Sequence, residues 1–245
     1  MTTIFWAGDS TVKQNGISTY PQTGIGQVFD RYTRPFQVLI DNCAENGRST
    51  KSFIDEGRLD AIDRHIREGD FLFIQFGHND EKAEDPSRYA DPDGAFRDNL
   101  ALFVETARRH GATPVLITPL TRFSFRDPAA AYHHDRWAAA VRETASRLKV
   151  ALVDLTQASE QLVDSMGEKA RTELYMNLPA GQYAAYPGGL ADGTHLQPMG
   201  AMAFGALIAQ ALLALGEPYA GLVSEEFSQW LQAGGRVTGP SLTQA

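Results

Sequence analysis

An aspartate and a histidine lie three residues apart late in this 245-residue chain, and a serine follows its first apolar segment. The pair is Asp192 and His195, and the serine is Ser10. A hydroxyl is a poor nucleophile at neutral pH unless a base removes its proton, and an imidazole base works best when a carboxylate fixes its tautomer. The three residues therefore predict a nucleophile (Ser10), a base (His195) and an orienting carboxylate (Asp192). The alternatives are a turn serine, a hydrogen-bonded histidine at a helix start and a turn aspartate.

These residues need a scaffold that brings them together, and the hydrophobic pattern predicts one. Short apolar segments alternate with amphipathic ones, which is typical of a parallel sheet covered by helices. Strands are expected at residues 3–7, 36–40, 71–76, 114–118 and 151–154, and helices at 26–32, 53–67, 94–110, 135–148, 156–173 and 198–215. Ser52 with Asp55 suggests a capping box at the start of the second helix. Residues 81–93 are expected to form an exposed loop, and residues 175–193 a long binding loop.

Polar residues follow the ends of the expected strands, where open α/β sheets bind their ligands. An acyl-transfer reaction also needs hydrogen-bond donors for the oxygen that becomes negatively charged. The natural donors are the backbone N–H groups of Ser10 and Gly47 and the side-chain amide of Asn79. Taken alone, Gly47 is equally typical of a left-handed turn and Asn79 of a turn amide.

Six further residues are candidate substrate contacts. Arg48 and Arg122 each follow a strand end, where a guanidinium could bind a uronic-acid carboxylate or form a structural salt bridge. His78 adjoins Asn79 and could orient the loop. Tyrosines in the expected binding loop could stack on sugar rings or pack within the loop; they are Tyr175, Tyr183 and Tyr186.

Composition and charge narrow the class of protein. The formal net charge of −8 argues against nucleic acid as a main partner. The single cysteine, Cys43, excludes an intramolecular disulfide and a cysteine-based metal site, and is expected to be a small buried hydrophobe. No metal or cofactor is expected, because the adjacent His133 and His134 have no other obvious ligands. Residues 199–215 are typical of a core helix rather than a membrane span. With no export signal at the start, a cytoplasmic protein without membrane contact is expected.

The motifs as a set resemble a known family. Ser10, Gly47, Asn79 and His195 match the four residues that name the SGNH (GDSL-like) hydrolases. The strings Ala7-Gly8-Asp9-Ser10-Thr11-Val12, Asn46-Gly47-Arg48-Ser49-Thr50-Lys51-Ser52-Phe53 and Gln75-Phe76-Gly77-His78-Asn79-Asp80 resemble the rhamnogalacturonan acetylesterase branch. The resemblance implies a flavodoxin-like three-layer α/β/α sandwich with a five-stranded parallel sheet. It also implies a metal-free serine esterase that deacetylates pectic carbohydrate.

The expectation is therefore one hydrolase domain over residues 1–237, with a flexible tail at 238–245. The polysaccharide-degrading members of the branch are often secreted, whereas no export signal is found here. The expected substrate is therefore a small acetylated oligosaccharide rather than the polymer. Two alternatives stay open. The same triad could act on lipid esters or thioesters, or the chain could be a noncatalytic carbohydrate-binding protein. No pair of acidic residues stands out as expected of a glycosidase.

Overall fold

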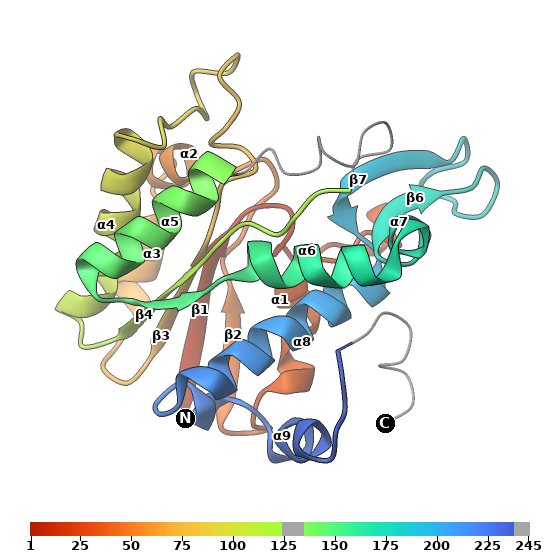
Figure 1. Cartoon of the computed structure of the whole chain (residues 1–245). Helices are drawn as coiled ribbons and strands as arrows, with labels where there is room; N and C mark the ends of the chain where they lie inside the picture. The colour runs from red at the N-terminus through yellow and green to blue at the C-terminus, as the bar shows by residue number, and fades with distance from the viewer. Residues whose placement is uncertain (124–134, 238–245) are drawn as a thin grey trace.

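The computed structural model describes residues 1–123 and 135–237, and its centre is a five-stranded parallel sheet (Figure 1). The strand order is β2-β1-β3-β4-β5, with every neighbouring pair parallel. The direction of winding reverses between β1 and β3, which makes this point the switch where such sheets bind ligands. The strands are β1 (Thr2–Gly8), β2 (Val38–Asn42), β3 (Phe71–Gln75), β4 (Thr113–Ile117) and β5 (Ala151–Val153).

Helices cover both faces of the sheet (Figure 1). One face carries α2, α3, α4 and α5, and the other carries α1, α6, α7, α8 and α9. The helices are α1 (Ile25–Val28), α2 (Thr50–Asp55), α3 (Arg58–His65), α4 (Ala95–Arg109), α5 (Asp135–Leu148), α6 (Leu155–Met166), α7 (Glu168–Glu173), α8 (Pro198–Leu215) and α9 (Glu225–Gln232). Short 3₁₀ turns lie at Ile17–Thr19, Phe29–Tyr32 and Ala220–Leu222.

The alternation of side chains along β1 shows why the sheet needs two helical layers. Ile4 and Trp6 belong to the core on one side, and Phe5 and Ala7 to the core on the other. Because both sets are apolar and buried, the strand is one continuous hydrophobic segment, as expected of a parallel strand covered on both faces. The three-layer α/β/α fold predicted by the family resemblance is thus present.

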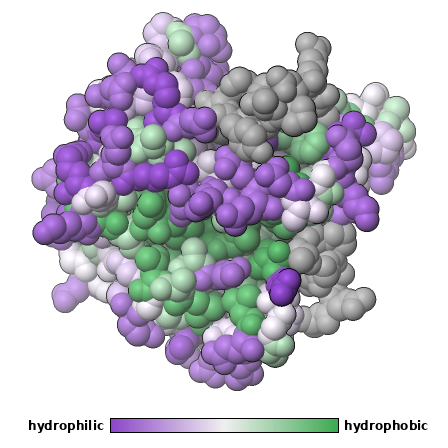
Figure 2. All heavy atoms as spheres, in the orientation of Figure 1, coloured by the Kyte–Doolittle hydropathy of each residue, from purple (hydrophilic) through white to green (hydrophobic). Residues whose placement is uncertain are grey.

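Helix α8 is the most apolar of the long helices in the described part of the chain. By length and composition alone it could cross a membrane, and half of its residues are buried inside the structure. Phe204, Ile208 and Leu212 lie in the core beneath the sheet, which agrees with the expected core helix. Figure 2 shows hydrophobic residues gathered across the middle of the visible face, with hydrophilic residues around them.

Several boundaries differ from those expected. The helix predicted at 53–67 is two helices, α2 and α3, because Gly57 between them adopts a left-handed conformation (φ +70°). Its N-cap is Ser49 rather than Ser52; Ser52 completes the capping box by bonding back to the Ser49 N–H. The helix predicted at 156–173 is likewise interrupted at Gly167. Strand β2 begins two residues later than expected.

The largest difference concerns residues 175–193, expected as one loop. Strands β6 (Tyr175–Leu178) and β7 (Leu190–Leu196) form an antiparallel hairpin there, and only the segment between them is a loop. The hairpin projects beside the sheet (Figure 1). The expected tail at 238–245 and the pair His133-His134 lie outside the described residues.

Candidate active site

Ser10 lies directly after β1, in a turn that the preceding aspartate holds. The Asp9 carboxylate accepts hydrogen bonds from the Thr11 N–H (2.9 Å) and the Thr11 hydroxyl (2.8 Å). Space for the turn comes from Gly8, where a Cβ would approach the Val12 side chain to 3.0 Å. These contacts fix Ser10 at the carboxyl end of β1, beside the switch point.

His195 and Asp192 lie on β7, which crosses to the same edge of the sheet. His195 Nδ1 is 2.6 Å from Asp192 Oδ2, and His195 Nε2 is 2.9 Å from Ser10 Oγ. The other Asp192 oxygen accepts the backbone N–H groups of Thr194 (2.8 Å) and His195 (3.0 Å). One imidazole therefore connects the serine to the carboxylate, in the arrangement that activates a hydroxyl nucleophile.

The electrostatics of Asp192 favour its ionised form. Burial opposes ionisation, but the hydrogen bond and charge of His195 and the two backbone N–H groups outweigh it and lower the pKa of Asp192 to about 2. A carboxylate that stays ionised at neutral pH can hold a proton on His195 Nδ1. The Nε2 atom is then free to accept the proton of Ser10.

Gly47 and Asn79 flank Ser10 from the segments that follow β2 and β3. Gly47 adopts a left-handed conformation (φ +74°), which agrees with its interpretation as a turn residue. Among the described residues, neither the Ser10 N–H nor the Gly47 N–H donates a hydrogen bond within the protein. The Asn79 amide donates to the Arg48 carbonyl (3.1 Å), which leaves its second N–H available. The structure thus brings the three expected donors to one edge without committing them elsewhere.

A buried pair of ionisable groups lies directly behind Ser10. His78 Nδ1 is 3.3 Å from Asp9 Oδ2, and both side chains are almost fully buried. Burial opposes ionisation of Asp9, but His78 and the bonds from Thr11 hold the pKa of this carboxyl below its usual value. The prediction that His78 contacts the substrate is wrong, because both of its ring nitrogens are shielded from solvent. Its position agrees with the other interpretation, in which it orients the loop.

Asp80 is a second buried carboxyl at this edge, and sequence reasoning gave it no role. Its Oδ1 accepts the Thr50 N–H (2.8 Å) and the Thr50 hydroxyl (2.5 Å), so it ties the loop after β3 to the start of α2. Burial raises the pKa of Asp80 to about 7, helped by the Asp9 charge and opposed by the bonds from Thr50. The loop that carries Asn79 is therefore anchored by a carboxyl that ionises near neutral pH.

Asp80→Asn is expected to change how stability depends on pH. Since the folded-state pKa of about 7 exceeds the unfolded value of 3.8, the stabilisation by Asp80 is complete below pH 3.8 and is lost as pH rises through 7. Asparagine keeps an acceptor for Thr50 but does not ionise. The free energy of unfolding of the variant, relative to wild type, should therefore increase by on the order of 2 kcal/mol between about pH 5 and about pH 8.

Urea denaturation of both proteins at the two pH values measures this difference, with Asp98→Asn on the exposed surface of α4 as the control. A parallel pH dependence of wild type and Asp80→Asn would show that the carboxyl ionises normally.

The two arginines expected as substrate contacts are held by carboxylates. Arg48 donates to Glu56 (2.9 Å) and to the Asn46 carbonyl (2.7 Å). Arg122 pairs with Glu81 and donates to the His78 carbonyl (3.2 Å). Both sets of contacts match the structural salt bridge that is the alternative for each residue.

The three tyrosines lie in different environments. Tyr175 is fully buried, and its hydroxyl donates to the Thr121 carbonyl (2.7 Å), so it cannot stack on a ligand and that prediction is wrong. Tyr186 is half-buried and lies near enough to Asp192 for burial and the Asp192 charge together to raise the pKa of its hydroxyl. Tyr183 contacts the exposed ring of Tyr20 edge to face, with ring centroids 5.8 Å apart. Tyr20, which sequence reasoning missed, thus joins Tyr183 as an accessible aromatic surface.

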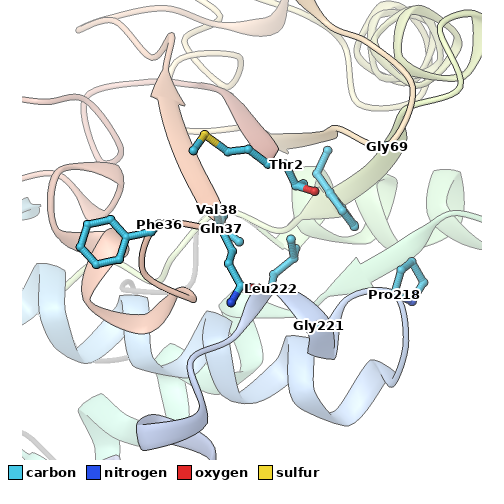
Figure 3. A pocket seen from close by; sticks show the side chains of 10 residues that line it. Thr2, Phe36, Gln37, Val38, Gly69, Pro218, Gly221 and Leu222 are labelled. Carbon is cyan, nitrogen blue, oxygen red and sulfur yellow. The ribbon is translucent and has the colours of Figure 1, made fainter.

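A surface hollow lies away from this site. A hollow of about 430 Å³ lies at the opposite end of the sheet, where Thr2, Val38 and Phe71 begin their strands (Figure 3). Because ligands of such sheets bind at the carboxyl ends, we assign no function to it.

Cys43 is half-buried, and burial raises the pKa of its thiol to about 12, so it is not a reactive thiolate. Among the described residues no cluster of three or more His, Cys, Asp or Glu could hold a metal ion.

Comparison with known proteins places this arrangement in a family. Residues 7–202 match the model of the GDSL-like Lipase/Acylhydrolase family. The chain belongs to this family. The protein is a carboxylic ester hydrolase. The matched segment runs through every residue of the Ser10–His195–Asp192 arrangement.

Individual relatives show which kind of hydrolase the chain resembles. The chain is 38% identical to the rhamnogalacturonan acetylesterase RhgT of Bacillus subtilis, over 88% of this chain and 91% of that protein. It is 35% identical to a probable rhamnogalacturonan acetylesterase, YesY, of the same organism, over 88% of this chain and 94% of that protein. The predicted likeness to the rhamnogalacturonan acetylesterase branch is confirmed.

Solved structures agree on the fold. YxiM of Bacillus subtilis superposes with a TM-score of 0.75 at 25% identity, over 89% of this chain and 57% of that longer chain. An acetylxylan esterase from Geobacillus stearothermophilus superposes with a TM-score of 0.60 at 15% identity, over 89% of this chain and 95% of that chain. The second match, at its low identity, supports the three-layer fold only.

Proposed function

We propose that this GDSL-like hydrolase is a serine esterase that removes acetyl groups from acetylated carbohydrate, with pectic oligosaccharides as its substrates. The observation that carries the proposal is the single imidazole of His195 within hydrogen-bond distance of both Ser10 and Asp192. The substrate class is supported by two relatives named as rhamnogalacturonan acetylesterases, which match 88% of the chain.

In the proposed first step Ser10 Oγ attacks the carbonyl carbon of the acetyl ester, and His195 Nε2 takes the hydroxyl proton. Asp192 stabilises the imidazolium that forms and keeps the ring oriented. The negative charge that develops on the carbonyl oxygen is held by the N–H groups of Ser10 and Gly47 and by the Asn79 amide. The tetrahedral intermediate collapses when the bond to the sugar oxygen breaks, and His195 gives its proton to that oxygen.

The second step returns the enzyme to its starting state. Water attacks the acetyl group on Ser10 while His195 Nε2 accepts a proton from it. Collapse of this intermediate releases acetate, and the proton returns from His195 to Ser10 Oγ. Each step uses groups of the protein and water, so the proposal needs no metal ion or cofactor. The cytoplasmic location and the single domain stay predictions.

Acetate release from a panel of acetylated pectic, xylan-derived and chitin-derived oligosaccharides tests the proposed substrate. We expect the highest kcat/KM on the pectic members, because one relative is named a rhamnogalacturonan acetylesterase and another a probable one. A second series compares nitrophenyl acetate with nitrophenyl octanoate. A preference for the octanoyl ester, with no acetate released from any sugar, would contradict the proposal and favour the lipid-ester alternative.

A further inference from the structure

Arg88 places a positive charge beside the donors proposed to hold the oxyanion. Its Nη1 atom lies 3.4 Å from the Asn79 carbonyl oxygen Oδ1. The same atom lies 3.6 Å from the point where a Cβ on Gly47 would be. Sequence reasoning assigned Arg88 to an exposed loop and gave it no role. The fold brings it next to two segments that are more than thirty residues apart from each other in the sequence.

The loop that carries Arg88 is anchored at both ends of a short turn. The Arg88 N–H donates to the Asp85 carbonyl (3.0 Å), and the Ala90 N–H donates to the Asp80 carbonyl (3.1 Å). The Trp137 indole N–H donates to the Ala90 carbonyl (3.0 Å), which joins the loop to α5. Arg88 therefore has a fixed backbone position relative to Asn79.

The guanidinium is held through two of its three nitrogens. Asp85 Oδ2 accepts from Arg88 Nε at 2.6 Å, and Asn79 Oδ1 accepts from Nη1 at 3.4 Å. Within the described ranges, Nη2 donates no hydrogen bond, and the side chain keeps 31% of its accessible surface. By contrast, Arg122 already uses both of its Nη atoms, Nη1 on Glu81 and Nη2 on the His78 carbonyl. Arg88 thus offers donors that a ligand can reach.

We infer that Arg88 binds the carboxylate of a uronic acid that lies next to the scissile acetyl group, an inference that rests on the proposed function. When the acetyl carbonyl oxygen occupies the position between Ser10, Gly47 and Asn79, a carboxylate on the same or the adjoining sugar ring is only a few bonds away. The uncommitted Nη2 of this guanidinium can donate to such a carboxylate, and a hydrogen bond between two charged groups is about twice as strong as one between neutral groups. Because the protein carries a net charge of −8, an acidic sugar requires such a local contact rather than long-range attraction.

A different role is open to the same residue, and the test must separate the two. By donating to Asn79 Oδ1, Arg88 could act only as a positioning residue that turns the amide N–H toward the oxyanion. That role would affect every ester alike, because every ester forms the oxyanion. Carboxylate binding affects only substrates that carry the negative charge.

The experiment uses one acetylated, galacturonate-containing oligosaccharide in two forms, with its carboxyl groups free or methyl-esterified. We expect wild type to prefer the free acid by about 10–100-fold in kcat/KM, the range of a hydrogen bond to a charged group. Arg88→Gln should abolish this preference, because kcat/KM on the free acid should fall to the value on the methyl ester, whereas any effect through Asn79 lowers both forms by the same factor. Arg109→Gln, at the far end of α4, is the matched control and should keep the preference.

Three results would overturn the inference. The first is a wild-type enzyme that deacetylates both forms equally, which leaves the proposed function intact. The second is an Arg88→Gln variant whose kcat/KM falls by the same factor on both forms. Arg88 would then act by positioning the Asn79 amide, and Asn79→Ala should lower kcat/KM on both forms equally as well. The third is a wild type that hydrolyses simple esters but releases acetate from neither form, which refutes the proposed function and the inference together.

Discussion

Ser10→Ala should lower kcat for acetate release by about 10⁴-fold or more, with the fold unchanged. The substitution removes the atom that forms the covalent bond to the acetyl group, and water cannot take its place at the same position. Within the described structure Ser10 Oγ makes a single hydrogen bond, to His195 at 2.9 Å, so its removal should hardly affect the free energy of unfolding. Release of acetate from nitrophenyl acetate and from the pectic oligosaccharides measures the effect.

The matched control for this variant is Ser165→Ala. Ser165 lies on α6 and donates to the Leu162 carbonyl within its own helix (2.7 Å), so its replacement should leave kcat unchanged. Circular dichroism and thermal unfolding of both variants establish that the fold is retained. Undiminished turnover in a folded Ser10→Ala protein would show that the chemistry does not pass through this hydroxyl.

Asp192→Asn should lower kcat by about 10⁴-fold through a change of imidazole tautomer. The asparagine Oδ1 can still accept the backbone N–H groups of Thr194 and His195, so the local backbone should be preserved. Its amide nitrogen would then face His195 Nδ1 as a donor. The ring must accept there and carry its proton on Nε2, where it can no longer accept the proton of Ser10.

Steady-state kinetics on the same esters measure this decrease, with Asp98→Asn as the exposed control. We expect KM to change little, because Asp192 contacts His195 rather than the substrate. A variant that keeps wild-type kcat across the neutral range would show that Asp192 does not set the state of His195.

Much of the central fold is predictable from the sequence because it depends on local pattern. The apolar segments of β1, β3 and β4 stand out, since strands covered on both faces are hydrophobic throughout. Helix α8 begins and ends where the pattern predicts, because Pro198 suits its first turn and Gly216 ends it. Strand β2 is harder to place because its side chains are half-buried or exposed, and its apolar signal is correspondingly weak.

The hairpin of β6 and β7 is the clearest case in which the sequence predicts the wrong structure. Its segment is rich in glycine, proline and tyrosine, which is typical of a loop, and the pairing of Met176 with Asp192 joins residues distant in the sequence. The register shift beside Tyr175 further weakens any alternating pattern. Only the pairing of the two strands in the fold shows that Asp192 and His195 lie on a β-strand rather than in a loop.

The candidate site is predictable where the hydrophobic pattern locates the strand ends and the last long helix, and unpredictable where a role depends on contacts made in the fold. Ser10, Asn79 and His195 each follow a strand end or precede the last long helix, and they converge at one edge as expected. Arg88 has no such position, and Asp80, although it follows the same strand end as Asn79, shows no sign of its role in the sequence. Arg88 reaches the site only because its loop folds back, and Asp80 is distinctive only because burial raises its pKa.

Labelling with a serine-reactive fluorophosphonate tests the central claim most directly, because it reports on the nucleophile without assuming a substrate. We predict one covalent adduct per chain, located by peptide mass spectrometry on Ser10, with esterase activity falling in step with labelling. The adduct should be absent in Ser10→Ala and retained in Ser165→Ala. A wild-type protein that stays unlabelled, or that carries the adduct on another residue while Ser10→Ala remains active, would contradict the account.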